Sequence, residues 1–265
     1  MIKIEHCVLP SPEQMDFIIE GMRNPKNSWD KSDSDSYAVT ATKDGQDFEV
    51  TEFSLGKSDH ELMKKLAFAG TEHRKYMRMM IVYVRITAPL YWWKEFDTYK
   101  VGTVANSCST MHKLTAKEFV IDDFSHEHLS EPALTVLRNT IETLNQARDL
   151  YLGYDGFKHQ WGDWEKEHYW WQMIQLLPSS YNQTRNVMLN YEVLCDIYRQ
   201  RKNHKLDEWQ NFCHWIEYLP WSELICQWPD GERPGKRVIV NIVGQRDIMN
   251  HPTSNIDTRN SCTPL

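Results

Sequence analysis

The stretch from Met80 to His112 constrains the fold more than any other part of the chain. It begins as an uninterrupted apolar run, passes through Pro89 and an aromatic block, and ends in small polar residues beyond Lys100. Apolar support followed by convergent polar groups is typical of a buried binding site. The same order also fits a core strand, a packed helix and an ordinary loop, so both interpretations stay open.

Within this stretch, residues 79–86 are apolar enough to predict a strand covered on both faces. Ala88 and Pro89 then begin a predicted helix that carries an aromatic block ending at Phe96. Residues 103–110 are predicted as a loop. Its asparagine, its serines and its backbone N–H groups are suited to cradle a phosphate or the edge of a flavin.

Capping and periodicity signals predict the remaining elements. Ser11, Pro12 and Gln14 supply an N-cap, an N1 proline and a capping-box partner, and Ser58 with Glu61 predicts a second capping box. The other predicted helices cover residues 132–152, 163–177, 180–201 and 206–219. Predicted strands cover residues 2–8, 37–42, 48–55 and 237–243, and residues 24–36 are predicted as a loop.

This order of elements predicts an α+β fold, with a mixed or antiparallel sheet and a block of long helices. We expect one domain over residues 1–249, because a core of that size fits a single unit. The segment 250–265 is polar and carries two prolines, so we expect a loosely packed tail.

The charge and the cysteines narrow the function. A net charge of -7 argues against a protein that coats nucleic acid or an anionic membrane, while a local basic pocket stays compatible with it. The six cysteines are scattered without a CxxC pair, and we expect reduced thiols in a cytoplasmic protein. His126 and His128 flank Glu127 without the HExxH pattern, so a zinc site is possible but not favoured.

Arg201 ends the predicted helix over residues 180–201, and its planar guanidinium suits bidentate contact with a phosphate. A solvated helix end, where cations complement the helix dipole, is the equally open alternative.

Two segments resemble conserved blocks of the flavin-dependent thymidylate synthases. The first reads GTEHRKYMRMMIVYVRITAPLYWWKEFDTYKVGTVANSCSTMH, over residues 70–112, and looks like a block with a Glu-His pair, an apolar strand, a basic triplet and a serine loop. The second reads LPSSYNQTRNVMLNYEVLCDIYRQRKNHKLDEW, over residues 177–209. In this segment Asn190 matches a family asparagine and Arg201 matches the arginine that grips the nucleotide phosphate.

The resemblance implies the thymidylate synthase-like fold and the methylation of dUMP with FAD, methylenetetrahydrofolate and NADPH. It also implies a homotetramer. By the same resemblance the cofactor-binding residues are His73, Lys100, Thr103, Asn106, Asn190 and Asp196. The substrate-binding residues are Ser107, Ser109, Arg201 and His204. The resemblance assigns no catalytic residue and no metal.

Departures from the family pattern leave the reaction open. Thr98, Tyr99 and Lys100 occupy the place of an Arg-His-Arg triplet, and Glu192 occupies the place of another arginine. Each charge-assisted contact to a phosphate is typically worth about 1.5–3 kcal/mol, so their loss favours an altered pyrimidine substrate or a protein without methyl transfer. The alternatives are therefore an enzyme, and a nucleotide-binding or structural oligomer. A single-strand nucleic-acid binder that stacks bases on its tryptophans is disfavoured by the negative charge.

Overall fold

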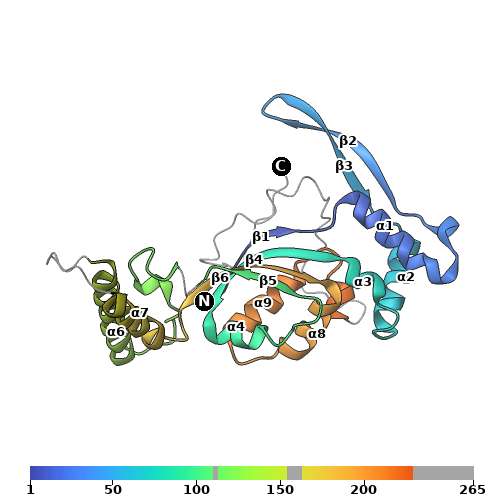
Figure 1. Ribbon diagram of the computed structural model, residues 1–265. Coiled ribbons are helices and arrows are strands. Elements are labelled where there is room, and N and C mark those ends of the chain that lie inside the picture. Colours follow the sequence, from blue (N-terminus) through green and yellow to red (C-terminus); the bar gives the residue numbers. More distant parts are fainter. Residues whose placement is uncertain (110–112, 154–162, 229–265) are drawn as a thin grey trace.

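The computed structural model describes residues 1–109, 113–153 and 163–228 (Figure 1). Its centre is a four-stranded sheet in the order β1-β4-β6-β5, in which all neighbouring strands are antiparallel. These strands are β1 (Lys3–Val8), β4 (Ile81–Pro89), β5 (Val104–Ser107) and β6 (Asn182–Asn190). Helices pack against one face of the sheet and at its ends (Figure 1), so the predicted α+β fold with an antiparallel sheet is confirmed.

One face of this sheet is buried and the other is open. Alternate residues of β4 and β6 are at most 3% exposed and point into the main core, among them Val82, Val84, Ile86, Val187 and Leu189. Helices α4 (Leu90–Phe96), α8 (Tyr191–Arg201) and α9 (Asp207–Glu217) pack below that face (Figure 1). On the opposite face Tyr83 is 51% exposed. The prediction of a strand covered on both faces is therefore wrong for the described chain, because an apolar run does not report what covers each face.

The predicted helix over residues 180–201 is wrong in its first half, which forms β6. The apolar side chains at Val187, Tyr191 and Leu194 keep helical spacing, but Val187 and Leu189 also keep the period of a strand. Asn190 separates the two elements, since its side chain accepts a hydrogen bond from Val193 N at 3.0 Å and caps α8.

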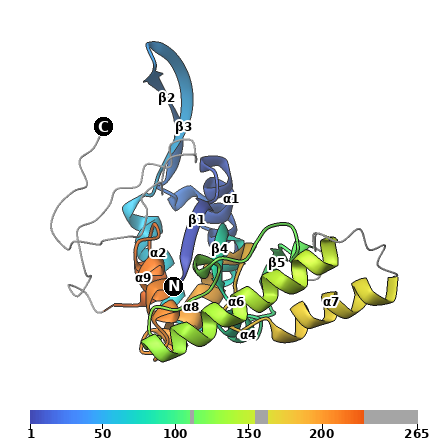
Figure 2. The same cartoon turned by 90° about the vertical axis from the view of Figure 1, so that its left-hand side faces the viewer.

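The N-terminal part follows its predictions closely. Helix α1 (Pro12–Arg23) begins with the predicted capping box of Ser11 and Gln14. Strands β2 (Asp35–Lys43) and β3 (Gln46–Ser54) form the predicted hairpin, with Asp44 and Gly45 both at positive φ in the turn. The hairpin projects far from the rest of the molecule (Figures 1 and 2), and it is called the arm below.

Helix α2 (Lys57–Phe68) does not use the predicted capping box of Ser58 and Glu61. The carboxylate of Asp33 instead accepts hydrogen bonds from the backbone N–H groups of Ser58 and Asp59, at 2.8 and 3.0 Å. The free N–H groups are thus satisfied by a residue distant in sequence, which local spacing does not reveal. The short helix α3 (Lys75–Met79) was not predicted.

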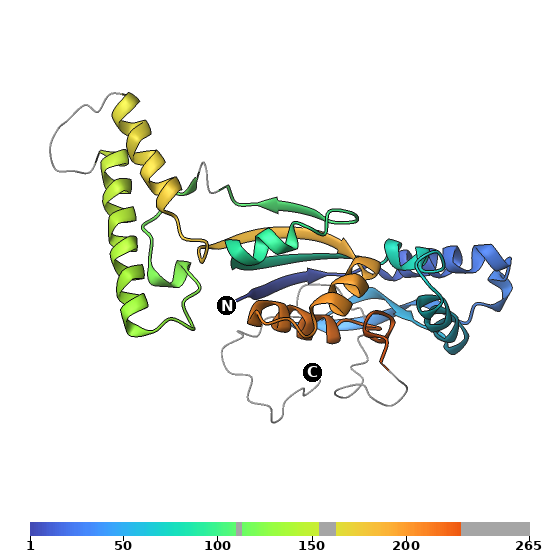
Figure 3. The same cartoon turned by 90° about the horizontal axis from the view of Figure 1, so that it is seen from below.

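Helices α6 (Glu131–Leu152) and α7 (Asp163–Leu176) were both predicted, and they pack side by side at one end of the sheet (Figures 2 and 3). They enclose a second, smaller hydrophobic core that includes Leu144 and Met173, both 0% exposed. Helix α10 (Glu223–Cys226) completes the described chain. The predicted strand at residues 237–243 and the predicted tail at 250–265 lie outside the described residues.

Candidate functional site

Arg201 lies in a corner formed by the ends of α4 and α8 and the start of α9. Its Nη1 atom lies 2.7 Å from Glu95 Oε2, and its Nε atom donates to the Tyr99 hydroxyl at 2.9 Å. Its guanidinium carbon lies 4.7 Å from the centre of the Trp209 ring, within cation–π distance. These contacts fix the plane of the guanidinium. We call Glu95, Tyr99, Arg201, His204 and Trp209 the Arg201 corner.

Glu95 is the shared acceptor of this corner. Its Oε2 atom accepts from Arg201 and from Trp209 Nε1, the latter at 2.9 Å, and His204 Nε2 lies 3.6 Å away. The carboxylate therefore neutralises much of the positive charge that an incoming phosphate would meet. Within the described residues, Nη2 of Arg201 has no hydrogen-bond partner, which leaves two donors of the guanidinium for a ligand.

A second arginine lies near the same end of α4. Arg185 on β6 places Nη1 2.7 Å from Asp97 Oδ1 and donates from Nε to Gln183 Oε1 at 2.9 Å. Its guanidinium carbon lies 4.2 Å from the centre of the Trp93 ring. The prediction of a helix over residues 180–201 gave no reason to single out this side chain.

Half of the predicted site residues gather around the end of α4, namely Lys100, Thr103, Asn190, Arg201 and His204. The Thr103 hydroxyl donates a hydrogen bond to the backbone oxygen of Tyr99, which is a residue of the Arg201 corner. This bond links the turn after α4 to that corner. Asn190 packs against the same turn, because a Cβ added at Gly102 would lie 3.0 Å from its Nδ2 atom. Lys100 is exposed.

The other half lies elsewhere, namely His73, Asn106, Ser107, Ser109 and Asp196. His73 is exposed and lies 3.5 Å from Glu72, and Asp196 pairs with Arg199 at 3.0 Å. Ser109 borders a separate hollow of about 280 Å³.

The predicted loop over residues 103–110 is wrong at its centre, where β5 forms. Asn106 and Ser107 are adjacent on this strand, so their side chains leave on opposite faces of the sheet. Asn106 lies on the open face, beside Arg85 and Asn186. Ser107 pairs in register with Arg185. The two side chains therefore do not form one cradle.

Glu192 stands where the resemblance expects an arginine, but its negative charge repels a phosphate less than that position alone suggests. It is 8% exposed and pairs with Arg78, whose Nη2 atom donates to Oε1 at 3.3 Å. The hydrogen bond to Glu192 raises the pKa of Arg78, so this guanidinium stays protonated. The carboxylate is thus compensated by a cation of its own chain.

Three of the free cysteines in the described chain, Cys7, Cys195 and Cys213, are at least partly buried, whereas Cys108 is exposed. Burial raises the pKa of Cys7, Cys195 and Cys213 to about 12, so these thiols are protonated at neutral pH. No cluster of three or more His, Cys, Asp or Glu side chains in the described ranges is placed to hold a metal ion. Within the same ranges, no helix is both long and apolar enough to span a membrane.

Solved structures with a similar fold include two of a flavin-dependent thymidylate synthase. The flavin-dependent thymidylate synthase ThyX from Helicobacter pylori, complexed with FAD and dUMP, matches with a TM-score of 0.51 and 17% identity, over 85% of this chain and 96% of that chain. A second ThyX structure from the same organism, with FAD and dUMP, matches with a TM-score of 0.52 and 16% identity, over 85% and 95% of the two chains. No family model and no curated protein matches the sequence.

The chain thus has a fold similar to that of flavin-dependent thymidylate synthase, and the resemblance predicted from residues 70–112 and 177–209 is confirmed at the level of the fold. Identities this low establish the fold alone, so the reaction has to be argued from this chain's own side chains.

Proposed function

We propose that the chain is a thymidylate synthase-like enzyme that reductively methylates dUMP or a related pyrimidine nucleotide. It would use FAD, methylenetetrahydrofolate and NADPH, and act in the cytoplasm. The observation that carries the proposal is the Arg201 corner. In a chain with this fold, its contacts orient the guanidinium of Arg201, the residue that the resemblance matches to the phosphate-binding arginine.

The donor set of the corner fits a phosphorylated nucleotide in part. Arg201 offers the two N–H groups of Nη2, and the exposed Lys100 adds a second cation after α4. In the proposal Ser107, Ser109 and His204 also contact the nucleotide. FAD supplies the redox chemistry when bound, while the protein orients the pyrimidine and compensates the phosphate charge.

The proposed flavin contacts are His73, Lys100, Thr103, Asn106, Asn190 and Asp196. Asn106 lies on the open face of the sheet, whereas Asp196 lies on α8, which packs on the other face. A site that used both side chains would draw them from different copies of the chain. The proposal therefore includes a homo-oligomer, with the tetramer that the resemblance implies.

A visible absorption spectrum of the purified protein, with and without added FAD, tests this function most directly. We expect the visible absorption of the flavin to stay with the protein through gel filtration. We also expect dUMP to raise the melting temperature, since a ligand that binds only the native state stabilises it. Absence of both effects would end the catalytic proposal and leave the fold.

A nucleotide-binding homologue without methyl transfer is the second candidate. This candidate is favoured by Glu95, whose carboxylate pairs with Nη1 of Arg201 and so takes up one of the donors that a phosphate would need. The two candidates differ in turnover. An enzyme forms dTMP from dUMP and oxidises NADPH in the presence of FAD and methylenetetrahydrofolate, whereas the homologue binds dUMP and leaves both reactants unchanged.

A further inference from the structure

The arm has one apolar face that neither core of its own chain covers. Directly paired residues share a face of a hairpin, and so do residues two apart. The pairs Val39 with Val50 and Ala41 with Phe48 therefore lie on one face, together with Tyr37. Phe48 is 42% exposed and Tyr37 is 43% exposed. None of these five side chains belongs to either hydrophobic core.

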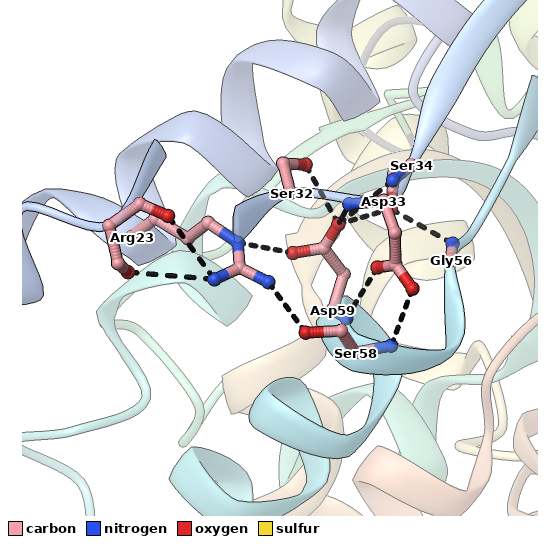
Figure 4. A network of polar contacts seen from close by, with 8 residues as sticks. Arg23, Ser32, Asp33, Ser34, Gly56, Ser58 and Asp59 are labelled. Carbon is pink, nitrogen blue, oxygen red and sulfur yellow. Dashed lines mark hydrogen bonds and ion pairs between the residues drawn. The ribbon is translucent and has the colours of Figure 1, made fainter. Parts of the chain in front are cut away.

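A polar network holds the arm rigidly at its base (Figure 4). Asp59 on α2 is 0% exposed and accepts hydrogen bonds from Arg23 Nε and from the hydroxyl and backbone N–H of Ser34, at 2.5 to 3.0 Å. Ser32 and Asp33 donate to the same carboxylate at 2.8 and 3.0 Å. An isolated two-stranded hairpin is only marginally stable in water, so a hairpin of this length gains stability when a partner covers it. The network at its base orients the arm, which lowers the entropy cost of binding such a partner.

The open face of the central sheet offers a matching surface. Register pairs Val8 with Tyr83, Tyr83 with Met188, and Met188 with Val104, which makes one apolar row across all four strands. Along this row lies a groove of about 270 Å³, which is also lined by Arg85. A cavity of about 150 Å³ already holds a benzene ring, so the groove has room for one aromatic side chain.

The apolar face of the arm carries an acidic side chain, Glu52, which pairs in register with Tyr37, whereas Asp47 and Glu49 lie on the opposite face. Beside the apolar row of the sheet, Arg85 hydrogen-bonds to Asn186 at 3.4 Å. Arg85 lies opposite Glu5 in the register of β1 and β4, but it forms no ion pair within the described part of the chain. An apolar face that carries Glu52 thus complements an apolar row flanked by Arg85.

We propose that the arm of one copy lies on the open sheet face of a second copy, with Phe48 in the groove beside Tyr83 and Met188. Glu52 lies on the apolar face of the arm, and in this arrangement its carboxylate approaches Arg85 of the other copy. This interface rests on the self-association in the proposed function and names its surface, and Asn106, a proposed flavin contact, lines the same groove.

The area is sufficient for a stable pair. Nine residues at about 3.4 Å each span roughly 30 Å, and a ribbon roughly 10 Å wide offers on the order of 300 Å² per face. Two reciprocal arms, each covering an equal area of the other copy, would bury roughly 1,200 Å², the lower bound of stable interfaces. A two-fold exchange of arms satisfies this requirement, whereas a single arm does not.

Sedimentation equilibrium of the wild type and of Phe48→Asp tests the interface. We expect the wild type to self-associate at micromolar concentration and Phe48→Asp to need at least a tenfold higher concentration. Ala38→Asp is the matched control, because Ala38 lies on the opposite face of the same arm, and it should behave as the wild type. A monomeric wild type, or an unchanged Phe48→Asp, would overturn the inference.

Photo-crosslinking with benzoylphenylalanine at position 48 gives a second test that does not depend on a disruptive variant. In a mixture of light and heavy isotope-labelled protein, we expect adducts between chains on β4 or β6, close to Tyr83 or Met188. Adducts within one chain, or on the arm of the other copy, would contradict the proposal. Flavin binding by the wild type reports the proposed catalysis separately, so either hypothesis can fail alone.

Discussion

At the scale of single residues, the pairing of Arg201 with Glu95 decides what the Arg201 corner can bind. A guanidinium with an unoccupied Nη2 atom attracts a phosphate, whereas the adjacent carboxylate repels it. The Glu95 side chain is 34% exposed, so solvent weakens both the attraction of a phosphate to Arg201 and its repulsion by Glu95.

Replacing Arg201 with alanine should weaken dUMP binding by about tenfold to a hundredfold, which corresponds to one charge-assisted contact. The fold should persist, because Glu95 is accessible enough to regain water. Titration calorimetry measures the affinity and circular dichroism the fold. Arg199→Ala is the control on the same helix, since Arg199 is 72% exposed and pairs with Asp196. Equal affinities for the two variants would remove Arg201 from the site.

Glu95→Gln should strengthen dUMP binding by about fivefold, or ~1 kcal/mol. The amide oxygen of glutamine still accepts from Arg201 and Trp209, while the negative charge is removed. Deoxyuridine serves as the control ligand, because it lacks the phosphate and its affinity should not change. Weaker binding of dUMP to the variant would show that Glu95 positions Arg201 more than it repels the phosphate.

The resemblance assigns Arg201 and His204 to one site, and in the structure both side chains lie near Glu95 because they follow each other at the end of α8. It did not predict Glu95 or Trp209. These two side chains reach Arg201 through the packing of α4 and α9, and contacts between distant elements leave no local spacing to detect.

At the scale of elements, the second half of the sheet shows where periodicity misleads. Residues 180–201 satisfy a helical period at four apolar positions, yet Val187 and Leu189 alternate as a strand requires. Tertiary pairing with β4 decides between the two. With the strand recognised, Arg185 would have emerged beside β5 as a candidate site residue.

The network at the base of the arm makes a sharp stability prediction. Asp59→Asn should destabilise the fold by about 3–5 kcal/mol, because it leaves the buried Arg23 without its counter-charge. Urea denaturation followed by circular dichroism measures the free energy of unfolding. Asp35→Asn, at an exposed position on β2, is the control and should change little.

The same network predicts a dependence on pH. Burial alone would raise the pKa of Asp59, but hydrogen bonds from Ser34, Ser32 and Arg23 lower it below its ordinary value. Because the pKa of Asp59 is lower in the native state, its carboxylate stabilises the fold at pH values above its pKa in the unfolded chain, which is about 3.9. This stabilisation is lost as the pH falls further. The stability difference between the wild type and Asp59→Asn should therefore shrink below about pH 4. A constant difference down to pH 2 would contradict this origin.

At the scale of the whole molecule, two hydrophobic cores are joined by backbone hydrogen bonds. Leu90 N and Tyr91 N donate to the carbonyl oxygens of Tyr181 and Ser179, both at 3.0 Å. Ser125 N donates to the carbonyl oxygen of Ser180 at 2.8 Å. The first two bonds connect the start of α4 to the segment between α7 and β6, and the third connects that segment to the one that leads into α6. The sequence predicted both helices, but it gave no sign that they enclose a separate core.

We propose that residues 1–249 behave as the single domain expected from the sequence, so that both cores unfold together. Leu144 lies in the smaller core, and Leu144→Ala should lower the stability of the whole chain by about 2–5 kcal/mol. Tryptophan fluorescence reports both cores, because Trp92, Trp93 and Trp209 lie in the large core and Trp170 packs against the smaller one, and circular dichroism reports all helices. The two urea transitions should coincide in the wild type and shift together in the variant, as two-state unfolding requires. Glu142→Ala, exposed on the same helix, should leave both unchanged. A variant transition that splits into two phases, of which only one shifts, would show that the α6 and α7 pair is a domain of its own.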